Sequence, residues 1–285
     1  MGLLPQPRGR IARGSIRLDG EEWVGQPPER WRALRGRRVA MVFQDPMTSL
    51  NPYMRIGDQL AEVLRLRGVN RRREVARRAA AQLERVGIPD ARGCLRSYPH
   101  RLSGGMRQRV MIAMALLAEA DLLIADEATT ALDVTIQAQI LALLRELRDE
   151  RAMSMLLITH DLGVVSGLCD RVVVMYAGRA LESGPARVLF DRPAHPYTRA
   201  LLRATPRVDG PTGASLESLD GLPPRLDGPP PPGCRFAARC SFVREACRSA
   251  EPELEAAGRG RLRRCIAPLE ELEASAGDGA HGASA

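Results

Sequence analysis

Residues 102–109 read LSGGMRQR, and this stretch decides the fold that the sequence predicts. Ser103 is a residue type that begins helices by accepting a hydrogen bond from the first turn. Gly104 and Gly105 carry no Cβ, so a phosphate can approach the backbone N–H groups there, where the helix dipole favours an anion. The alternative is a plain helix cap with a glycine turn, and the run by itself does not decide between the two.

A second run follows after the length of one helix. Residues 122–127 read LLIADE, which predicts a buried parallel strand with Asp126 and Glu127 at its carboxyl end. Ligands of open α/β sheets bind at that edge. One carboxylate there can hold Mg²⁺ and its neighbour can orient an attacking water, although an acidic pair can also merely cap the next turn.

Apolar runs and helical periodicities alternate along the rest of the chain. Strands are expected at 38–43, 122–126, 155–159 and 171–176, and helices over 53–101 and at 104–118, 135–151 and 161–168. Strands that alternate with helices predict a parallel α/β sheet. Within the helical region, Val75, Ala79 and Leu83 share one face with Val86, and Gly87 is placed to end that helix. Residues 1–5 resemble the end of a helix, and residues 14–20 a short strand closed by a turn.

Composition bounds the class of protein. The 285 residues are 45% hydrophobic and 27% charged, which suits one large globular domain with an appendage. The net charge is +8, and every basic residue other than histidine is arginine, because the chain contains no lysine. The arginines are scattered without an aromatic platform, so a solvated surface and no nucleic-acid partner are expected. No apolar run reaches the ~18 residues of a membrane span, no secretory signal is expected, and the compartment expected is the cytosol.

Two more polar residues follow predicted strands. Gln44 follows the 38–43 strand and could reach a metal ion or water, while His160 follows the 155–159 strand and could hydrogen-bond a terminal phosphate. Each has a plainer alternative, an ordinary loop amide and a structural histidine. A functional role for Gln44 and His160 is supported only by their order in the sequence relative to residues 102–109 and 122–127.

That order resembles a known family, the nucleotide-binding subunits of ATP-binding cassette (ABC) transporters. Their Q-loop, signature, Walker B, D-loop and switch histidine are similar here to Gln44, residues 102–108, Asp126-Glu127, Ala131-Leu132-Asp133 and His160. The sequences FQDPMTSLNP at 43–52 and HPYT at 195–198 are typical of the oligopeptide/dipeptide (peptide/nickel) importer ATPases. The resemblance covers roughly residues 1–268.

The resemblance implies an α/β fold: a P-loop-NTPase-like ABC nucleotide-binding domain, with a mostly parallel sheet and a helical subdomain, that lacks its N-terminal portion and Walker A. The expected domains are an incomplete ABC ATPase at 1–205 with a helical subdomain at about 53–103, a Pro/Gly-rich linker at 206–233, a Cys-containing oligopeptide-transporter C-terminal region at 234–268, and a disordered tail at 269–285.

The resemblance also implies a mechanism in which two subunits form a head-to-tail dimer with ATP and Mg²⁺ in the interface. Glu127 would be the general base, and His160 the second catalytic residue. Asp126 and Gln44 would bind Mg²⁺. The expected nucleotide-binding residues are Gln44, Ser103, Gly104, Gly105, Gln108, Asp126 and Asp133, of which Ser103, Gly105 and Gln108 would contact the partner's nucleotide and Asp133 would pass between sites.

The activity implied is ATP hydrolysis coupled to uptake of peptides or similar small solutes. The implied partners are integral-membrane permease subunits, on which residues 53–101 would dock, a second ABC ATPase subunit, and indirectly an extracytoplasmic solute-binding protein. The implied location is peripheral, on the cytoplasmic face of the plasma membrane. A DNA-repair or translation-factor ATPase is disfavoured, because the chain has one cassette and no sustained heptads. A hydrolysis-deficient partner subunit stays open, because a chain without lysine contains no G-x-x-x-x-G-K-[ST] loop.

Four of the six cysteines fall within the predicted C-terminal region. Cys234, Cys240, Cys247 and Cys265 follow the pattern C-x5-C-x6-C-x17-C. Four thiolates can hold an iron–sulfur cluster or zinc. Similar cysteine tails occur in the peptide-importer ATPases, and some of them are reported to carry a [4Fe–4S] cluster. A cluster is the preferred interpretation, with zinc second and buried thiols third.

Overall fold

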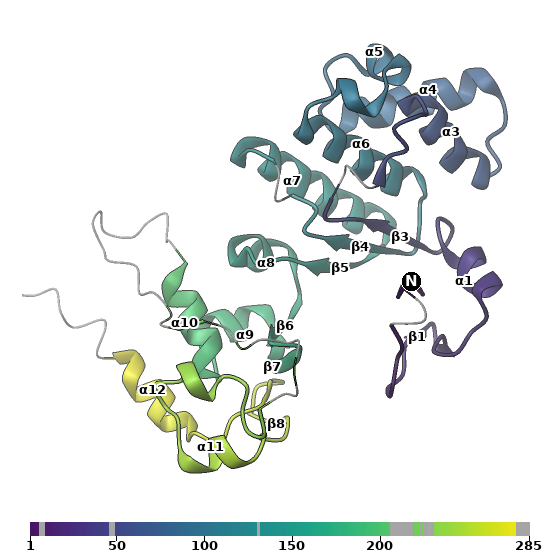
Figure 1. Cartoon of the computed structure of the whole chain (residues 1–285). Coiled ribbons are helices and arrows are strands. Elements are labelled where there is room, and N and C mark those ends of the chain that lie inside the picture. The colour runs from purple at the N-terminus through teal and green to yellow at the C-terminus, as the bar shows by residue number, and fades with distance from the viewer. Residues whose placement is uncertain are drawn as a thin grey trace, which may run out of the picture. The chain divides into compact units, whose positions relative to one another are not determined.

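The computed structural model describes residues 1–5, 9–45, 49–129, 132–205, 219, 221–222, 224, 228 and 231–277, with only the backbone at 151 and 275–277. The chain forms two compact units, Met1–His160 and Asp161–Ala285, whose elements are labelled in Figure 1. Each unit is described by itself below.

A three-stranded parallel sheet forms the centre of the first unit. Its strands are β3 (Val39–Val42), β4 (Leu122–Asp126) and β5 (Ser154–Ile158), in the order β3-β4-β5. The register pairs Val42 with Ala125 and Asp126 with Ile158, so the three strands end close to one another. The predicted parallel sheet is confirmed. Edge strand β5 leaves Leu156 51% and Ile158 45% exposed, so the described residues of this unit do not cover that part of the sheet.

Helices account for most of the remaining first unit. Their bounds are α1 Pro28–Leu34, α3 Ile56–Leu66, α4 Arg72–Arg85, α5 Ala91–Arg96, the short 3₁₀ helix η1 Pro99–Arg101, α6 Gly104–Leu117 and α7 Val134–Arg151. The helical region predicted over 53–101 consists of α3, α4, α5 and η1, and the helices predicted at 104–118 and 135–151 are α6 and α7.

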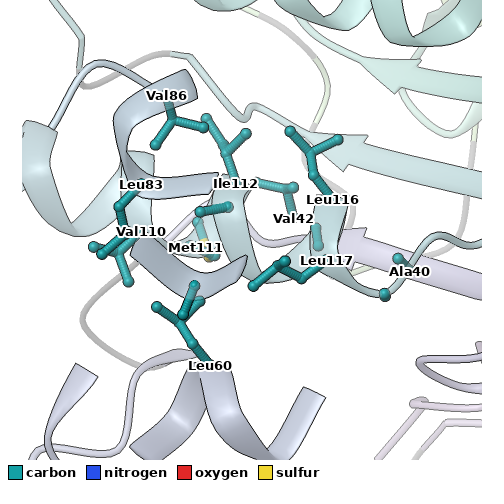
Figure 2. Packing of buried hydrophobic residues seen from close by; sticks show 14 of the residues in the cluster. Ala40, Val42, Leu60, Leu83, Val86, Val110, Met111, Ile112, Leu116 and Leu117 are labelled. Atoms are coloured by element: carbon teal, nitrogen blue, oxygen red, sulfur yellow. The ribbon is translucent and has the colours of Figure 1, made fainter. Parts of the chain in front are cut away.

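Helix α6 lies at the centre of the hydrophobic core. From Val110 to Leu117 it is apolar around its whole circumference, and all of these residues except Met114 are buried. Figure 2 shows Val110, Met111 and Ile112 of α6 among side chains of α3, α4 and β3. Helix α6 therefore joins the helical region to the sheet and fixes the place where its own first turn emerges.

The apolar face predicted on α4 is confirmed. Val75, Ala79 and Leu83 are buried, and the arginines on the opposite face are exposed. Gly87 follows the helix at φ 77°, a left-handed conformation that glycine adopts without steric cost. Its N–H donates to Glu84 O at 2.9 Å, which closes the last turn as predicted.

The first part of the chain partly corrects the sequence prediction. Residues 1–5 are not helical. Instead, the Arg35 guanidinium donates hydrogen bonds to the carbonyl oxygens of Met1 and Gly2, each at 2.9 Å. These carbonyls are therefore satisfied by a side chain and not by a helical turn. The predicted short strand and turn form a hairpin of β1 (Arg17–Leu18) and β2 (Glu21–Glu22).

The second unit is built on an antiparallel sheet of order β6-β7-β9-β8. Its elements are α8 Leu162–Leu168, β6 Arg171–Tyr176, β7 Arg179–Pro185, α9 Ala186–Asp191, α10 Pro196–Ala204, η2 Ala237–Arg239, α11 Glu245–Ser249, β8 Glu255–Ala256, β9 Leu262–Arg263 and α12 Leu269–Gly277. The 171–176 strand was expected in the parallel sheet, and that expectation is wrong. A two-residue turn at Ala177 and Gly178, both at positive φ, folds β6 back on β7 as a hairpin, whereas a parallel pair needs a long crossover.

Helix α12 corrects the predicted disorder of 269–285 over residues 269–277. Leu272 is 2% exposed, its carbonyl accepts a bond from buried Arg199, and Arg244 pairs with Glu271 at 2.7 Å. These contacts order the helix despite its small and polar composition. Residues 278–285 and most of the predicted 206–233 linker lie outside the described residues, and the predicted domain boundaries stay predictions.

Candidate functional site

Polar side chains from three strands meet at one edge of the parallel sheet. Strand β4 ends at Asp126, while Gln44 and His160 each lie two residues beyond the ends of β3 and β5. Because the carboxyl ends of parallel strands share an edge, the fold brings these positions together as the sequence predicts. This is the edge at which open α/β sheets bind ligands.

Glu127 is the centre of the arrangement. Gln44 Nε2 donates to Glu127 Oε2 at 2.9 Å, and His160 Nδ1 lies 3.2 Å from Glu127 Oε1. The Glu127 backbone has φ 47°, a conformation unusual for a residue with a side chain, and its N–H donates to Ile158 O at 2.9 Å. Two neighbours and a constrained backbone therefore fix the direction of this carboxylate.

His160 can bind Glu127 and still present its other nitrogen. A neutral His160 must carry its proton on Nδ1 to donate to the carboxylate, which leaves Nε2 as an acceptor. The side chain is 70% exposed, so Nε2 is open to solvent. A protonated His160 would instead offer an N–H to an anion such as phosphate.

Asp126 differs from its neighbour. Its carboxylate makes no hydrogen bond or ion pair with any residue that the structure describes. The Asp126 carboxylate and the Gln44 amide lie at or just beyond the ends of neighbouring strands, at the same edge of the sheet. Their oxygens are ligand types that suit Mg²⁺, which prefers oxygen ligands and keeps several waters. The two residues predicted to hold Mg²⁺ therefore fit the ion chemically.

The LSGGMRQR run begins α6 as predicted. Ser103 Oγ accepts from Met106 N at 3.3 Å, and Ser103 and Gly104 are exposed while Gly105 is half-buried. An ideal Cβ at Gly104 would meet no atom within 4 Å. The first turn of a helix of 14 residues therefore opens to solvent, where it can accept an anion.

Gln108 does not lie where the sequence prediction placed it. Its side chain is 0% exposed, and Nε2 donates to Ala128 O, just beyond Glu127. A direct contact with a partner's nucleotide is not available in this arrangement. One turn into α6, position 108 faces the sheet, so Gln108 connects the exposed helix start to the loop that carries the acidic pair. No local pattern shows this, because Gln108 stands between two other polar residues, Arg107 and Arg109.

Asp133 is exposed at the start of α7, where its side chain accepts from Ile136 N at 3.0 Å. This capping bond is an ordinary structural role, and its predicted passage between two sites stays a prediction. Ala131 of the predicted D-loop, together with Pro46, Met47 and Thr48 of the 43–52 run, lies outside the described residues.

The four cysteines of the pattern lie together in the second unit. Cys234, Cys240, Cys247 and Cys265 all line one small cavity of about 10 Å³ with His195. Among the described residues, no three or more His, Cys, Asp or Glu side chains are arranged to hold a metal ion. Burial raises the pKa of Cys240 to about 11 and also raises the pKa values of Cys234 and Cys265. The iron–sulfur and zinc expectations are therefore not supported, and the arrangement fits buried neutral thiols.

The comparisons with known proteins agree with the arrangement at the sheet edge. The family model for ABC transporters matches residues 3–130, and that for the oligopeptide/dipeptide transporter C-terminal region matches residues 181–247. The oligopeptide transport ATP-binding protein OppD of Salmonella typhimurium is 52% identical over 272 residues, 95% of this chain and 80% of that protein. The chain belongs to the family of ABC-transporter ATP-binding proteins that includes OppD.

Two further comparisons support the family. OppD of Escherichia coli is 52% identical over 272 residues, covering 95% of this chain and 79% of that protein. Among solved structures, the ATP-binding cassette MJ0796, as a post-hydrolysis dimer bound to ADP and Pi, matches with a TM-score of 0.58 and 25% identity over 63% of this chain and 76% of that chain. The predicted ABC-type α/β fold is therefore confirmed. No helix in the described parts of the chain is both long and apolar enough to span a bilayer.

Proposed function

We propose that the chain is an ATP-binding and ATP-hydrolysing subunit of an importer for peptides or similar small solutes. The observation that carries this proposal is the convergence of Gln44 and His160 on Glu127, at 2.9 and 3.2 Å, beside the uncommitted Asp126. The family supports the solute class, because OppD is named for oligopeptide transport.

The positions of the edge residues support a role for each of them. Glu127, aimed by Gln44 and His160, is the general base that accepts a proton from an attacking water. When both of its ring nitrogens carry a proton, His160 can donate Nε2–H to the terminal phosphate of ATP. Asp126 and Gln44 would hold Mg²⁺, which would neutralise phosphate charge.

The exposed start of α6 serves a second copy of the chain or a paralogous ATPase. Ser103, Gly104 and Gly105 offer their N–H groups to a nucleotide held by the partner. Gln108 couples this turn to the loop after Glu127 through its bond to Ala128 O, so it acts as a positioning residue. Asp133, exposed at the start of α7, passes between the two sites.

The partners follow from the family. The helical region at 53–101 docks on integral-membrane permease subunits, and a solute-binding protein delivers the solute from outside. The chain then works as a peripheral protein at the cytoplasmic face of the plasma membrane. No nucleic acid takes part.

A hydrolysis-deficient partner subunit is the second candidate. The observation that favours it is the absence of lysine from all 285 residues, because a phosphate-loop lysine normally contacts the β- and γ-phosphates. In this version the chain binds ATP weakly in its own site and supplies only the start of α6 to a partner's ATP.

Mg·ATP binding and turnover by the full chain test the proposal, with Glu127→Gln, Asp126→Asn and the exposed control Glu84→Gln on α4. Loss of a general base should lower turnover by about 10²-fold or more while the Kd changes little, and Asp126→Asn should weaken Mg²⁺-dependent binding. Wild-type turnover in the Glu127→Gln chain would contradict the proposal.

The second candidate predicts a different result. The wild-type chain alone would show no turnover above background. Mixed with Salmonella OppD, it would raise the rate of that protein, and a Gly104→Asp variant would not, because its carboxylate repels phosphate.

A further inference from the structure

One turn of the helical region carries a concentration of arginine that the proposed ATP site does not use. Residues 65–73, at the junction of α3 and α4 in Figure 1, read RLRGVNRRR and contain five arginines and no acidic residue. All five arginines are exposed, and Leu66 among them is 53% exposed. This segment, the basic turn, corrects the expectation that the arginines of the chain are scattered.

A second arginine-rich segment lies against the basic turn. Residues 35–38, between α1 and β3, read RGRR, and a Cβ added at Gly36 would lie 3.6 Å from Leu66 Cδ1. The flanking arginines of this segment are committed elsewhere, Arg35 to backbone carbonyls and Arg38 to two aspartates. Arg37 is exposed. Two segments far apart in the sequence therefore bring arginines to the surroundings of one exposed leucine.

Few of these charges are neutralised within the chain. Arg67 pairs with Glu119 at 3.6 Å, and Glu74 of α4 is committed to two arginines on its own helix. No hydrogen bond or ion pair to a residue that the structure describes is made by the side chains of Arg37, Arg65, Arg71, Arg72 and Arg73. Exposed Glu62 on α3 forms no ion pair with them, so the five guanidinium groups leave a local excess of positive charge.

The start of α4 adds to this positive charge. Arg71 is the N-cap of the 14-residue helix and makes no capping hydrogen bond with its side chain, and Arg72 and Arg73 begin the first turn. The positive end of a helix dipole disfavours cations and favours anions. These three arginines therefore lower the stability of the free chain, and an anionic surface in front of them would offset that loss.

We propose that the basic turn, with Arg37 beside it, binds the surface of a membrane that contains anionic phospholipids. The guanidinium groups bind the phosphates of the headgroups. Leu66 enters the boundary between the headgroups and the acyl chains. This contact depends neither on the acidic pair at Asp126 and Glu127 nor on the start of α6, so it is separate from ATP turnover.

The exposed leucine decides between a membrane and other anionic partners. Nucleic acid offers phosphates but no apolar layer, and the basic turn has no aromatic side chain on which a base could stack. A small phosphate ion is held best by guanidinium groups fixed in convergent positions, whereas five of these side chains have no fixed partner in the described parts of the chain. Such cations around an apolar side chain are the combination that binds an anionic membrane interface.

Co-sedimentation of the full chain with lipid vesicles tests the proposal. The chain should bind phosphatidylcholine vesicles that contain about 30% phosphatidylserine. It should bind pure phosphatidylcholine vesicles weakly, and high salt should release it from the anionic ones. Arg65→Gln combined with Arg72→Gln should lower the partition coefficient roughly 25-fold, about fivefold for each charge.

The control removes the same charge from other surfaces. Arg92→Gln on α5 combined with Arg171→Gln on β6 changes two exposed arginines. Helix α5 lies against the first turn of α3, where Ile56 N donates to Ser97 O at 2.9 Å, whereas the basic turn begins at the last turn of α3. The control should lower the partition coefficient by less than about twofold, and Glu127→Gln should bind the vesicles as the wild-type chain does.

Leu66 reports whether the chain enters the lipid. Leu66→Ala should lower the partition coefficient by about three- to tenfold. In Leu66→Trp, brominated phosphatidylcholine in the anionic vesicles should quench the added tryptophan. The native Trp23 and Trp31, which are 5% and 8% exposed, should keep their emission. Absence of binding to the anionic vesicles, equal losses in the two double variants, an unquenched tryptophan in Leu66→Trp, or tighter binding to a DNA oligonucleotide than to the vesicles would overturn the proposal.

Discussion

His195 is a buried histidine that stays neutral in the folded protein. Its side chain is 1% exposed, and its Nδ1 accepts from Tyr197 N at 3.0 Å. Burial, with Arg263 nearby, lowers its pKa from 6.5 to about 4. A proton on Nδ1 would face the Tyr197 N–H, so the first turn of α10 depends on the neutral ring.

The stability of the second unit should therefore fall in acid. The unfolded chain takes up a proton on this histidine near pH 6.5, whereas the folded chain resists until about pH 4. The contribution of the neutral His195 to the free energy of unfolding is fully present above pH 6.5 and is lost as the pH falls toward 4. Below pH 4 the loss is complete, and it amounts to about 3 kcal/mol.

His195→Asn keeps an acceptor at the helix start and removes this titration. Hydrogen exchange in peptides of β7 and α10 measures the opening free energy of each chain against pH. Burial raises the pKa of Glu182, which acts with the opposite sign, but both chains contain it and their difference isolates His195. Parallel losses in the two chains would show that His195 does not carry the effect.

Single residues differ in how far the sequence predicts them. Gln44, Glu127 and His160 could be predicted, because each follows an apolar strand and parallel strands end together. Gln108 could not, because it lies in the polar run Arg107–Arg109, and which of these side chains faces the sheet depends on tertiary packing. Its burial was therefore found only in the structure.

Helix α4 shows how an element holds the helical region together. Leu83 is 0% exposed, within the cluster shown in Figure 2. Leu83→Ala should lower the free energy of unfolding of the first unit by about 2–5 kcal/mol, through lost transfer energy and the cavity it leaves. Urea denaturation followed by circular dichroism measures this change.

Leu66→Ala is the matched control, because Leu66 on α3 is 53% exposed. It should cost less than about 1 kcal/mol. Equal losses at the two positions would contradict the core assigned to α4.

At the scale of elements, helical periodicity and the length of apolar runs predicted most of the helices and strands of the first unit. The strands β3, β4 and β5 and the helices α6 and α7 came from apolar runs and helical faces. The second unit was predicted less well, because β7 reads RALESGP, a polar run without clear alternation. Its pairing with β6 depends on the turn at Ala177 and Gly178 and on buried Glu182, which accepts from Ala194 N at 2.7 Å and from His195 N at 3.1 Å. Hydrogen bonds from residues 12 and 13 positions away to a buried carboxylate produce no local pattern in the sequence.

At the scale of the whole molecule, the proposed function requires two chains at one ATP. Within one chain, Glu127 follows strand β4 and Gly104 begins helix α6. A Cβ added at Gly104 would meet no neighbouring atom, so a side chain fits there without a clash. Gly104→Asp should therefore keep the fold, since an acidic residue suits a helix start, while its charge repels phosphate. Gly104→Asn is the matched neutral control.

Mixing two inactive variants tests the composite site. Glu127→Gln keeps the helix start and Gly104→Asp keeps the base, so a mixed dimer contains one intact composite site and one doubly altered site. Random pairing of equal amounts makes half of the dimers mixed, and the mixture should recover roughly one quarter of the wild-type rate from two chains that are each inactive. If the wild-type chain itself lacks turnover, Mg·ATP-dependent association in the ultracentrifuge replaces the rate: Gly104→Asp alone stays monomeric, and added Glu127→Gln draws it into dimers. A mixture that behaves as the average of its two components would place the complete site within one chain and refute the shared arrangement.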